Sequence, residues 1–292
     1  MAQSSYNIKD VYKEISTIDG YFGEEDGKYG GRVEHFNNQI AQYCPYNNIL
    51  EGYYCMNYLY RASSGVINLL DMLKDKFDSK YDKLAEYAIL LLIYKLNQHP
   101  QYKSTNLNDF YTNHIEKNTF YDKKIKDSDS MTYKDIIDKK KDLMNTNEIF
   151  KFNEAFSILV LLYNEIKKNK LDCTKCSTKA NEFVQNFEKL NDDSNINGNA
   201  SYSKLLFTLS DDYDNFKSYY AEKCSGCKDI PTLPEIKTPP SKLIPALSTF
   251  SVIPVFLGIA YKYSLFGVDK LFQRQYIRKK LKKVKKKLKL NI

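Results

Sequence analysis

Tryptophan is absent from the 292-residue chain, and glycine and proline number only 11 and 8. This scarcity excludes collagen-like chains and low-complexity chains rich in proline and glycine. Hydrophobic residues make up 42% of the sequence and charged residues 27%, which excludes wholesale disorder and allows one large domain or two ordinary ones. Alternating strand-like runs of useful length are also missing, so we expect helices.

Residues for catalysis are equally sparse. The three histidines, His35, His99 and His114, are isolated, and neither H-E-x-x-H nor G-x-S-x-G occurs. The glycines between Gly20 and Gly31 lie in an acidic stretch unsuited to phosphate, which we interpret as a loop. The sequence therefore predicts a protein that is not an enzyme, with no catalytic residue, no metal and no cofactor.

Excess positive charge is missing from most of the chain. Residues 262–292 hold 12 basic residues and one acidic residue, which leaves 32 basic and 35 acidic residues in residues 1–261. The net charge of +8 therefore arises in the last tenth of the chain. This charge distribution therefore does not predict a uniformly basic surface that binds nucleic acid.

Charge of either sign is absent between Lys242 and Lys262. As a helix, the 19 residues Leu243–Tyr261 would be about 28 Å long, close to the ~30 Å hydrocarbon core of a bilayer. A buried core helix is the alternative, but core helices rarely lack charge on every face over this length. The sequence therefore predicts a transmembrane helix at residues 243–261.

The flanking charges predict how this helix is oriented. Lysine and arginine gather on the cytosolic side of membrane spans, so the tail at residues 262–292 is expected in the cytosol and residues 1–242 on the opposite side. The first thirty residues contain no apolar stretch typical of a cleavable signal peptide, so the span would also serve for targeting. The alternative is a tail-anchored adaptor or trafficking protein whose large domain stays cytosolic.

Apolar residues recur in the tail at spacings mostly of three, four and seven, which predicts a basic amphipathic helix. Such a helix suits an anionic inner leaflet, so membrane lipid is an expected partner; a solvated tail without a specific role is the alternative. The basic residues expected at the membrane surface are Arg278, Lys279, Lys280, Lys282, Lys283, Lys285, Lys286 and Lys287.

Helical periodicity dominates the rest, and the sequence predicts an all-α fold with a multi-helix ectodomain at residues 1–227. Residues 228–242 carry four prolines and are expected to form an extended stalk before the membrane. The helices are expected at Asp82–Gln98, Ile149–Lys168, Ser201–Lys223, Gly65–Phe77, Tyr133–Met144 and Thr178–Leu190.

The six cysteines comprise two C-x-x-C pairs and two single residues: Cys44, Cys55, Cys173, Cys176, Cys224 and Cys227. An even number in a translocated domain favours disulfides, although six cysteines permit fifteen pairings and the sequence does not choose among them. The two pairs also resemble zinc knuckles, but the 47 residues between them are not the usual compact spacing. Reduced thiols are the third alternative.

Several strings resemble one known family. SKLIPALSTFSVIPVFLGIAYKYSLFG, followed by DKLFQRQYIRKKLKKVKKKL, resembles the membrane span and tail of the Plasmodium interspersed repeat (PIR) proteins, the variant antigens of malaria parasites. YAILLLIYKLNQ, FKFNEAFSILVLLYNEI and CKDIPTLPEIKTPPSKLI resemble the ectodomain pattern of these proteins. A cysteine of that pattern is missing around KDVYKEISTIDGYF.

The resemblance implies display on the parasite or infected red-cell surface or on exported vesicles. It further implies antigenic variation, binding of a host protein receptor and no enzymatic activity. Variation is expected on exposed loops, because loops tolerate change and carry function. The candidate loops are Gly20–Gly31, Gln98–Asn108 and Asn191–Ala200.

Overall fold

The computed structural model describes most of the chain up to residue 237, in the ranges 6–26, 32–49, 51–77, 80–126, 130–168, 172–224 and 227–237. Residues 1–237 form a unit of their own. The predicted transmembrane helix, residues 243–261, and the basic tail, residues 262–292, lie outside the described residues. Within the ranges above, no helix combines the length and the apolar character needed to cross a bilayer.

The centre of the unit is α4 (Tyr81–Gln98), which is buried on nearly every side. Its sequence is apolar without interruption from residue 88 to residue 93, so the helix is stable only when other helices surround it. Its helical neighbours include α3 (Tyr58–Leu73), α6 (Tyr133–Asp138) and α7 (Asn153–Ile166). The helix predicted at Asp82–Gln98 is therefore confirmed.

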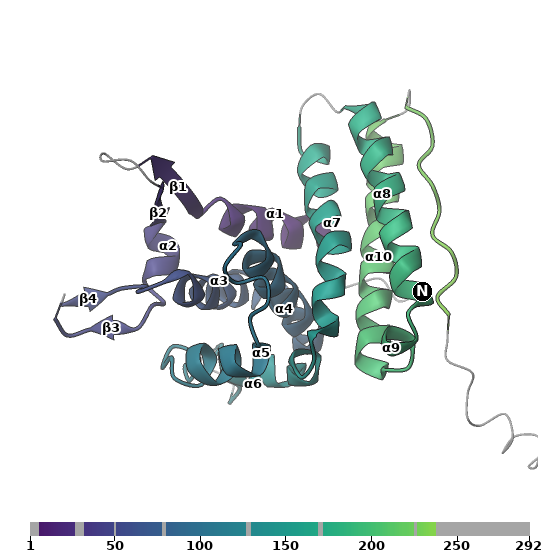
Figure 1. Ribbon diagram of the computed structural model, residues 1–292. Coiled ribbons are helices and arrows are strands. Elements are labelled where there is room, and N and C mark those ends of the chain that lie inside the picture. Colours follow the sequence, from purple (N-terminus) through teal and green to yellow (C-terminus); the bar gives the residue numbers. More distant parts are fainter. Residues whose placement is uncertain are drawn as a thin grey trace, which may run out of the picture. The chain divides into compact units, whose positions relative to one another are not determined.

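Three long helices lie side by side next to this centre: α7, α8 (Cys173–Asp192) and α10 (Ala200–Lys223), as Figure 1 shows. α1 (Ile8–Asp19) packs against α7 and α3, and the short α9 (Ser194–Asn197) lies between α8 and α10 in the chain. α10 confirms the helix predicted at Ser201–Lys223. α8 begins five residues before the predicted Thr178, because the Asp172 side chain caps it by accepting a hydrogen bond from the Lys175 amide.

Two predicted helices are interrupted. The helix expected at Tyr133–Met144 divides into α6 and a 3₁₀ turn at Lys141–Met144, and the one expected at Ile149–Lys168 begins as a 3₁₀ turn, Asn147–Phe152, before α7. Lys140 leaves the helical conformation (φ −130°, ψ 20°). Its buried ammonium lies 2.7 Å from the Glu86 carboxylate of α4, and this ion pair favours the break.

Strands are present where none was expected. β1 (Phe22–Asp26) pairs antiparallel with β2 (Arg32–Phe36), and β3 (Tyr46–Asn47) pairs antiparallel with β4 (Gly52–Tyr53). The expected Gly20–Gly31 loop thus includes a strand. Phe22 seats this strand on the core: its ring lies 5.7 Å from that of Tyr58, and a Cβ on Gly65 of α3 would come within 3.3 Å of it. The remaining short elements are α2 (Asn38–Ala41), α5 (Leu107–Phe110) and a π-helical turn at Tyr111–Ile115.

The segment after α10 is extended and lies on the domain (Figure 1). Ile230 is buried, the Tyr213 hydroxyl donates to the Pro231 carbonyl (2.8 Å), and the Asn191 amide donates to the Glu235 carbonyl (2.8 Å). Residues 227–237 therefore pack against α8 and α10, although residues 228–237 belong to the predicted stalk. Residues 238–242 of that stalk lie outside the described residues.

Candidate functional site

The first disulfide joins Cys44 and Cys55 and closes the hairpin that contains β3 and β4. Both cysteines are buried, and their sulfur atoms lie 3.3 Å and 3.7 Å from the Ser64 hydroxyl of α3. The bridge therefore fixes the base of the hairpin to the helical core and leaves the residues between the two cysteines to project from it.

The second disulfide joins Cys173, at the start of α8, to Cys227, just after α10. It links one cysteine of each C-x-x-C pair. Cys176 and Cys224 are buried free thiols, and burial raises the pKa of Cys176 to about 11. A protonated, buried thiol is a poor nucleophile, so neither cysteine has the environment of a reactive site.

The two C-x-x-C pairs are thus brought together, as zinc knuckles would be, but a disulfide consumes one cysteine of each. Among the described residues, no cluster of histidine, cysteine and carboxylate side chains could hold a metal ion. The zinc-binding alternative therefore finds no support in this geometry.

The described histidine side chains are likewise separate. His114 is buried between the rings of Tyr60 and Phe110, and burial together with the nearby Lys117 charge lowers its pKa to about 4. His99 packs on the ring of Tyr58, 4.6 Å away. These contacts are those of core aromatic residues.

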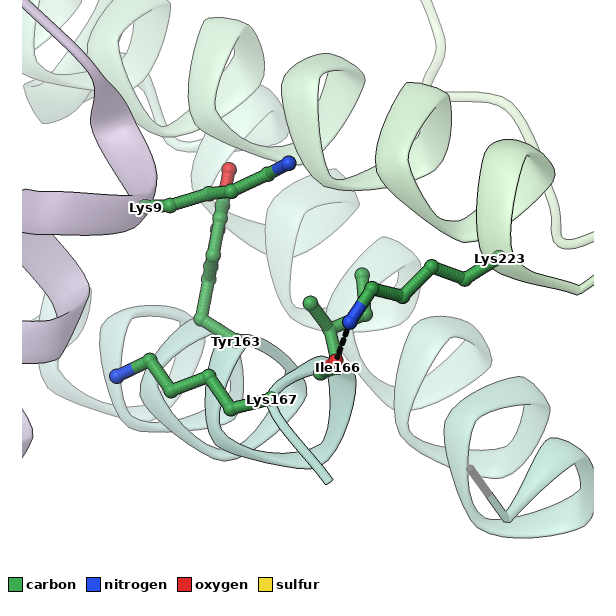
Figure 2. Close-up of a pocket in the computed structure, with 5 residues that line it drawn as sticks. All are labelled: Lys9, Tyr163, Ile166, Lys167 and Lys223. Atoms are coloured by element: carbon green, nitrogen blue, oxygen red, sulfur yellow. Dashed lines mark hydrogen bonds between the residues drawn. The ribbon is translucent and has the colours of Figure 1, made fainter. Parts of the chain in front are cut away.

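One cavity between α1, α7 and α10 is lined by three lysines, Lys9, Lys167 and Lys223, with Tyr163 and Ile166 (Figure 2). Its volume is about 90 Å³, well below the roughly 300–1,000 Å³ of small-molecule sites. Lys223 already donates to the Ile166 carbonyl (2.7 Å), and the Lys9 ammonium lies over the Tyr219 ring. The cavity is therefore too small for a substrate or cofactor, and two of its three lysines already have partners.

The most perturbed carboxyl group is Asp212 of α10, which is buried in the core. Its two oxygens accept hydrogen bonds from the hydroxyls of Tyr12 (2.8 Å) and Tyr87 (2.7 Å). Burial is the main cause that raises its pKa to about 7, against which the two hydrogen bonds act. Because a substrate could not reach it, Asp212 connects α1, α4 and α10 rather than performing chemistry.

Two of the loops expected to vary contain residues that pack against the domain. In Gln98–Asn108, the Tyr102 ring stacks on Tyr58. In Asn191–Ala200, Asn191 is 1% exposed and Ile196 is fully buried. Asn191 and Ile196 are therefore not part of the exposed surface that was expected, and Tyr102 is partly buried.

The most exposed apolar side chains lie instead in the disulfide-closed hairpin, residues 44–56, which the sequence reasoning did not single out. Ile49 is 91% exposed and Met56 69%. A sequence signal was present: Glu51 is the one charged residue between residues 37 and 60, and two cysteines bracket it. Because this hairpin gathers most of the exposed large apolar side chains among the described residues, its projecting surface is the candidate site.

Comparison with known proteins gives two findings. Residues 12–262 match the family model of the Plasmodium variant antigen protein Cir/Yir/Bir. The fold is similar to a solved structure described as a Plasmodium PIR protein ectodomain, with 36% sequence identity and a TM-score of 0.58, covering 79% of this chain and 99% of the other. No match was found among curated proteins.

Proposed function

Because the chain belongs to the Plasmodium Cir/Yir/Bir variant antigen family, we propose that it is a single-pass membrane antigen displayed on the parasite or infected red-cell surface or on exported vesicles. Its proposed function is recognition and antigenic variation, not catalysis. The 36% identity with a PIR ectodomain over nearly the whole of that chain supports an ectodomain of the same kind.

The observation that carries this proposal is the disulfide framework of residues 1–237. Two bridges, Cys44–Cys55 and Cys173–Cys227, fasten the domain at separate places. Stable disulfides are typical of proteins outside the reducing cytosol. They therefore favour a translocated ectodomain over a tail-anchored adaptor with its large domain in the cytosol.

The C-terminal part completes the proposed arrangement. The Leu243–Tyr261 segment spans the membrane, and the tail beyond it lies against the anionic inner leaflet through its lysines and arginines. Residues 1–261 hold slightly more acidic than basic residues, and this net charge also disfavours nucleic acid as a partner. A host protein receptor on the outer side is the proposed partner.

Protease shaving of intact infected cells tests the proposal. Trypsin added outside should remove the domain at residues 1–237, and an antibody to the tail should then detect a short membrane-bound remnant. A parasite cytosolic protein serves as the control for intact membranes. Protection of the whole chain in intact cells, with cleavage only after permeabilisation, would establish the cytosolic adaptor instead.

A further inference from the structure

The hairpin at residues 44–56 is a built projection with a fixed base. The Cys44–Cys55 bridge closes it, and the Tyr54 amide donates to the Pro45 carbonyl (3.1 Å) just inside that bridge. Tyr46 and Tyr53 then face each other across the strand pair, with ring centroids 5.4 Å apart. A hairpin with only two paired residues on each strand would be marginal alone, so the bridge supplies its shape.

Contacts outside the hairpin hold its base against the helices. The Tyr43 hydroxyl donates to the Asp71 carboxylate of α3 (3.0 Å), and the Asn118 amide donates to the Tyr43 carbonyl (2.9 Å). The Phe120 ring packs against Tyr53, 5.3 Å away. The surface is therefore preorganised, which reduces the entropy lost when a partner binds.

Apolar side chains concentrate on this projection. Of the seven large apolar side chains that are exposed among the described residues, five belong to the hairpin. These five are Tyr46, Ile49, Tyr53, Tyr54 and Met56. Figure 1 shows β3 and β4 standing apart from α7, α8 and α10. A second molecule can therefore approach them without meeting the long helices.

The composition of the hairpin identifies the kind of partner. Tyrosine and methionine are enriched in the cores of protein–protein interfaces, whereas lysine and acidic residues are depleted there. Attraction to an anionic membrane needs lysine or arginine, and residues 37–60 contain neither. The hairpin thus fits a protein surface better than a lipid surface.

Glu51 adds a charge requirement. It is exposed, and it has no ion-pair partner among the residues that the structure describes. The φ of Glu51 is 50°, in the left-handed region that favours glycine. Because glycine would form this turn with less backbone strain, the turn itself does not explain why a glutamate is present. A complementary partner presents a basic side chain opposite Glu51, with an apolar, weakly charged area around it.

We propose that the exposed side chains of this hairpin form the docking surface for a host protein whose contact face is apolar at its centre and carries one basic side chain opposite Glu51. The described residues of this surface are Tyr46, Ile49, Glu51, Tyr53, Tyr54 and Met56. This inference rests on the proposed function, because it requires residues 1–237 to be displayed outside the cell. It assigns the binding to one rigid projection.

The experiment uses the full-length chain displayed on cells and an array of soluble host cell-surface protein ectodomains as probes. Vesicles of phosphatidylcholine, with and without phosphatidylserine, and the chain's own ectodomain are included in the array. The variants are Ile49→Ser with Met56→Ser, and separately Glu51→Lys. The matched control is Leu161→Ser with Phe207→Ser, which changes two exposed apolar residues on α7 and α10.

At least one host protein should bind the wild type and the control alike, and each hairpin variant should weaken that binding by about tenfold or more. Equal binding by the hairpin variants, hairpin-dependent binding only to vesicles or to the chain itself, or no binding to any probe would overturn the proposal. Protease shaving of the same cells distinguishes failure of the proposed function from failure of the docking proposal. A domain that is not displayed contradicts the proposed function. A displayed domain whose binding is unchanged in the hairpin variants contradicts the docking surface alone.

Discussion

At the scale of single residues, the domain is held together by polar side chains placed deep among aromatic rings. Asp212 is the clearest case, because one carboxyl group joins Tyr12 of α1 and Tyr87 of α4 to α10. Tyr163 of α7 adds a hydrogen bond to the Asp212 carbonyl (2.7 Å). Four helices thus meet at one residue.

The raised pKa of Asp212 predicts a pH-dependent stability. Its folded pKa of about 7 exceeds the ordinary value, so the folded state holds the proton more tightly than the unfolded chain. The stability that Asp212 contributes should therefore fall as pH rises from about 4 to about 7, and it should be absent above that range. Between pH 5 and pH 8 the loss should be on the order of 2 kcal/mol. Asp212→Asn should remove it, since an amide accepts from one tyrosine and donates to the other.

Urea unfolding of residues 1–237 at pH 5 and pH 8 measures this effect. Because the lowered pKa of His114 adds stability as pH rises over this range in both proteins, the quantity to compare is the difference between them. The free energy of unfolding of the Asp212→Asn domain, relative to that of the wild type, should be higher at pH 8 than at pH 5 by on the order of 2 kcal/mol. The same slope in both proteins would show that Asp212 is ionised in the folded state at both pH values.

The cysteines provide a second prediction at this scale. In the folded domain, Cys176 and Cys224 are buried, and burial raises the pKa of both thiols. Iodoacetamide should therefore label neither in the folded protein at neutral pH. After unfolding without reductant it should label these two and leave Cys44, Cys55, Cys173 and Cys227 unlabelled, as peptide mass mapping will show. Labelling of any of the other four would contradict the pairing.

At the scale of elements, the sequence predicted what depends on local pattern. α4 and α10 were found because their apolar residues continue over many turns. β3 and β4 were missed because two-residue strands leave no alternation to detect. The break after α6 was missed because it involves Lys140 meeting Glu86, 54 positions away in the chain. The Cys173–Cys227 pairing likewise depends on how α8 and α10 pack, which the spacing of the cysteines in the sequence does not reveal.

That ion pair yields a prediction for the α4–α6 contact. Glu86 and Lys140 are 4% and 6% exposed, and Glu86 also accepts a hydrogen bond from Thr208 of α10 (2.6 Å). Glu86→Ala leaves a buried ammonium without its partner and should cost about 3 kcal/mol or more. Glu86→Leu combined with Lys140→Met replaces both charges by apolar groups and should recover most of that loss. Chemical denaturation of the three proteins checks this, and a double variant no more stable than Glu86→Ala would refute it.

At the scale of the whole molecule, the described unit ends close to where the membrane segment is predicted to begin. Cys227 is bonded to α8, and residues 228–237 lie on the domain, so five residues separate Lys237 from Leu243 in the sequence. The hairpin at residues 44–56 is carried by α3, a different part of the fold from the α8–α10 end.

The proposed orientation places residues 1–242 outside the cell and residues 262–292 in the cytosol, and epitope tags at the two ends of the chain distinguish the two sides. Epitope tags placed at Met1 and at Ile292 of the full-length protein are stained in unbroken and in permeabilised infected cells. Antibody should stain the Met1 tag in unbroken cells. It should stain the Ile292 tag only after permeabilisation. Staining of the Ile292 tag in unbroken cells, or of neither tag until the membrane is opened, would contradict the proposed orientation.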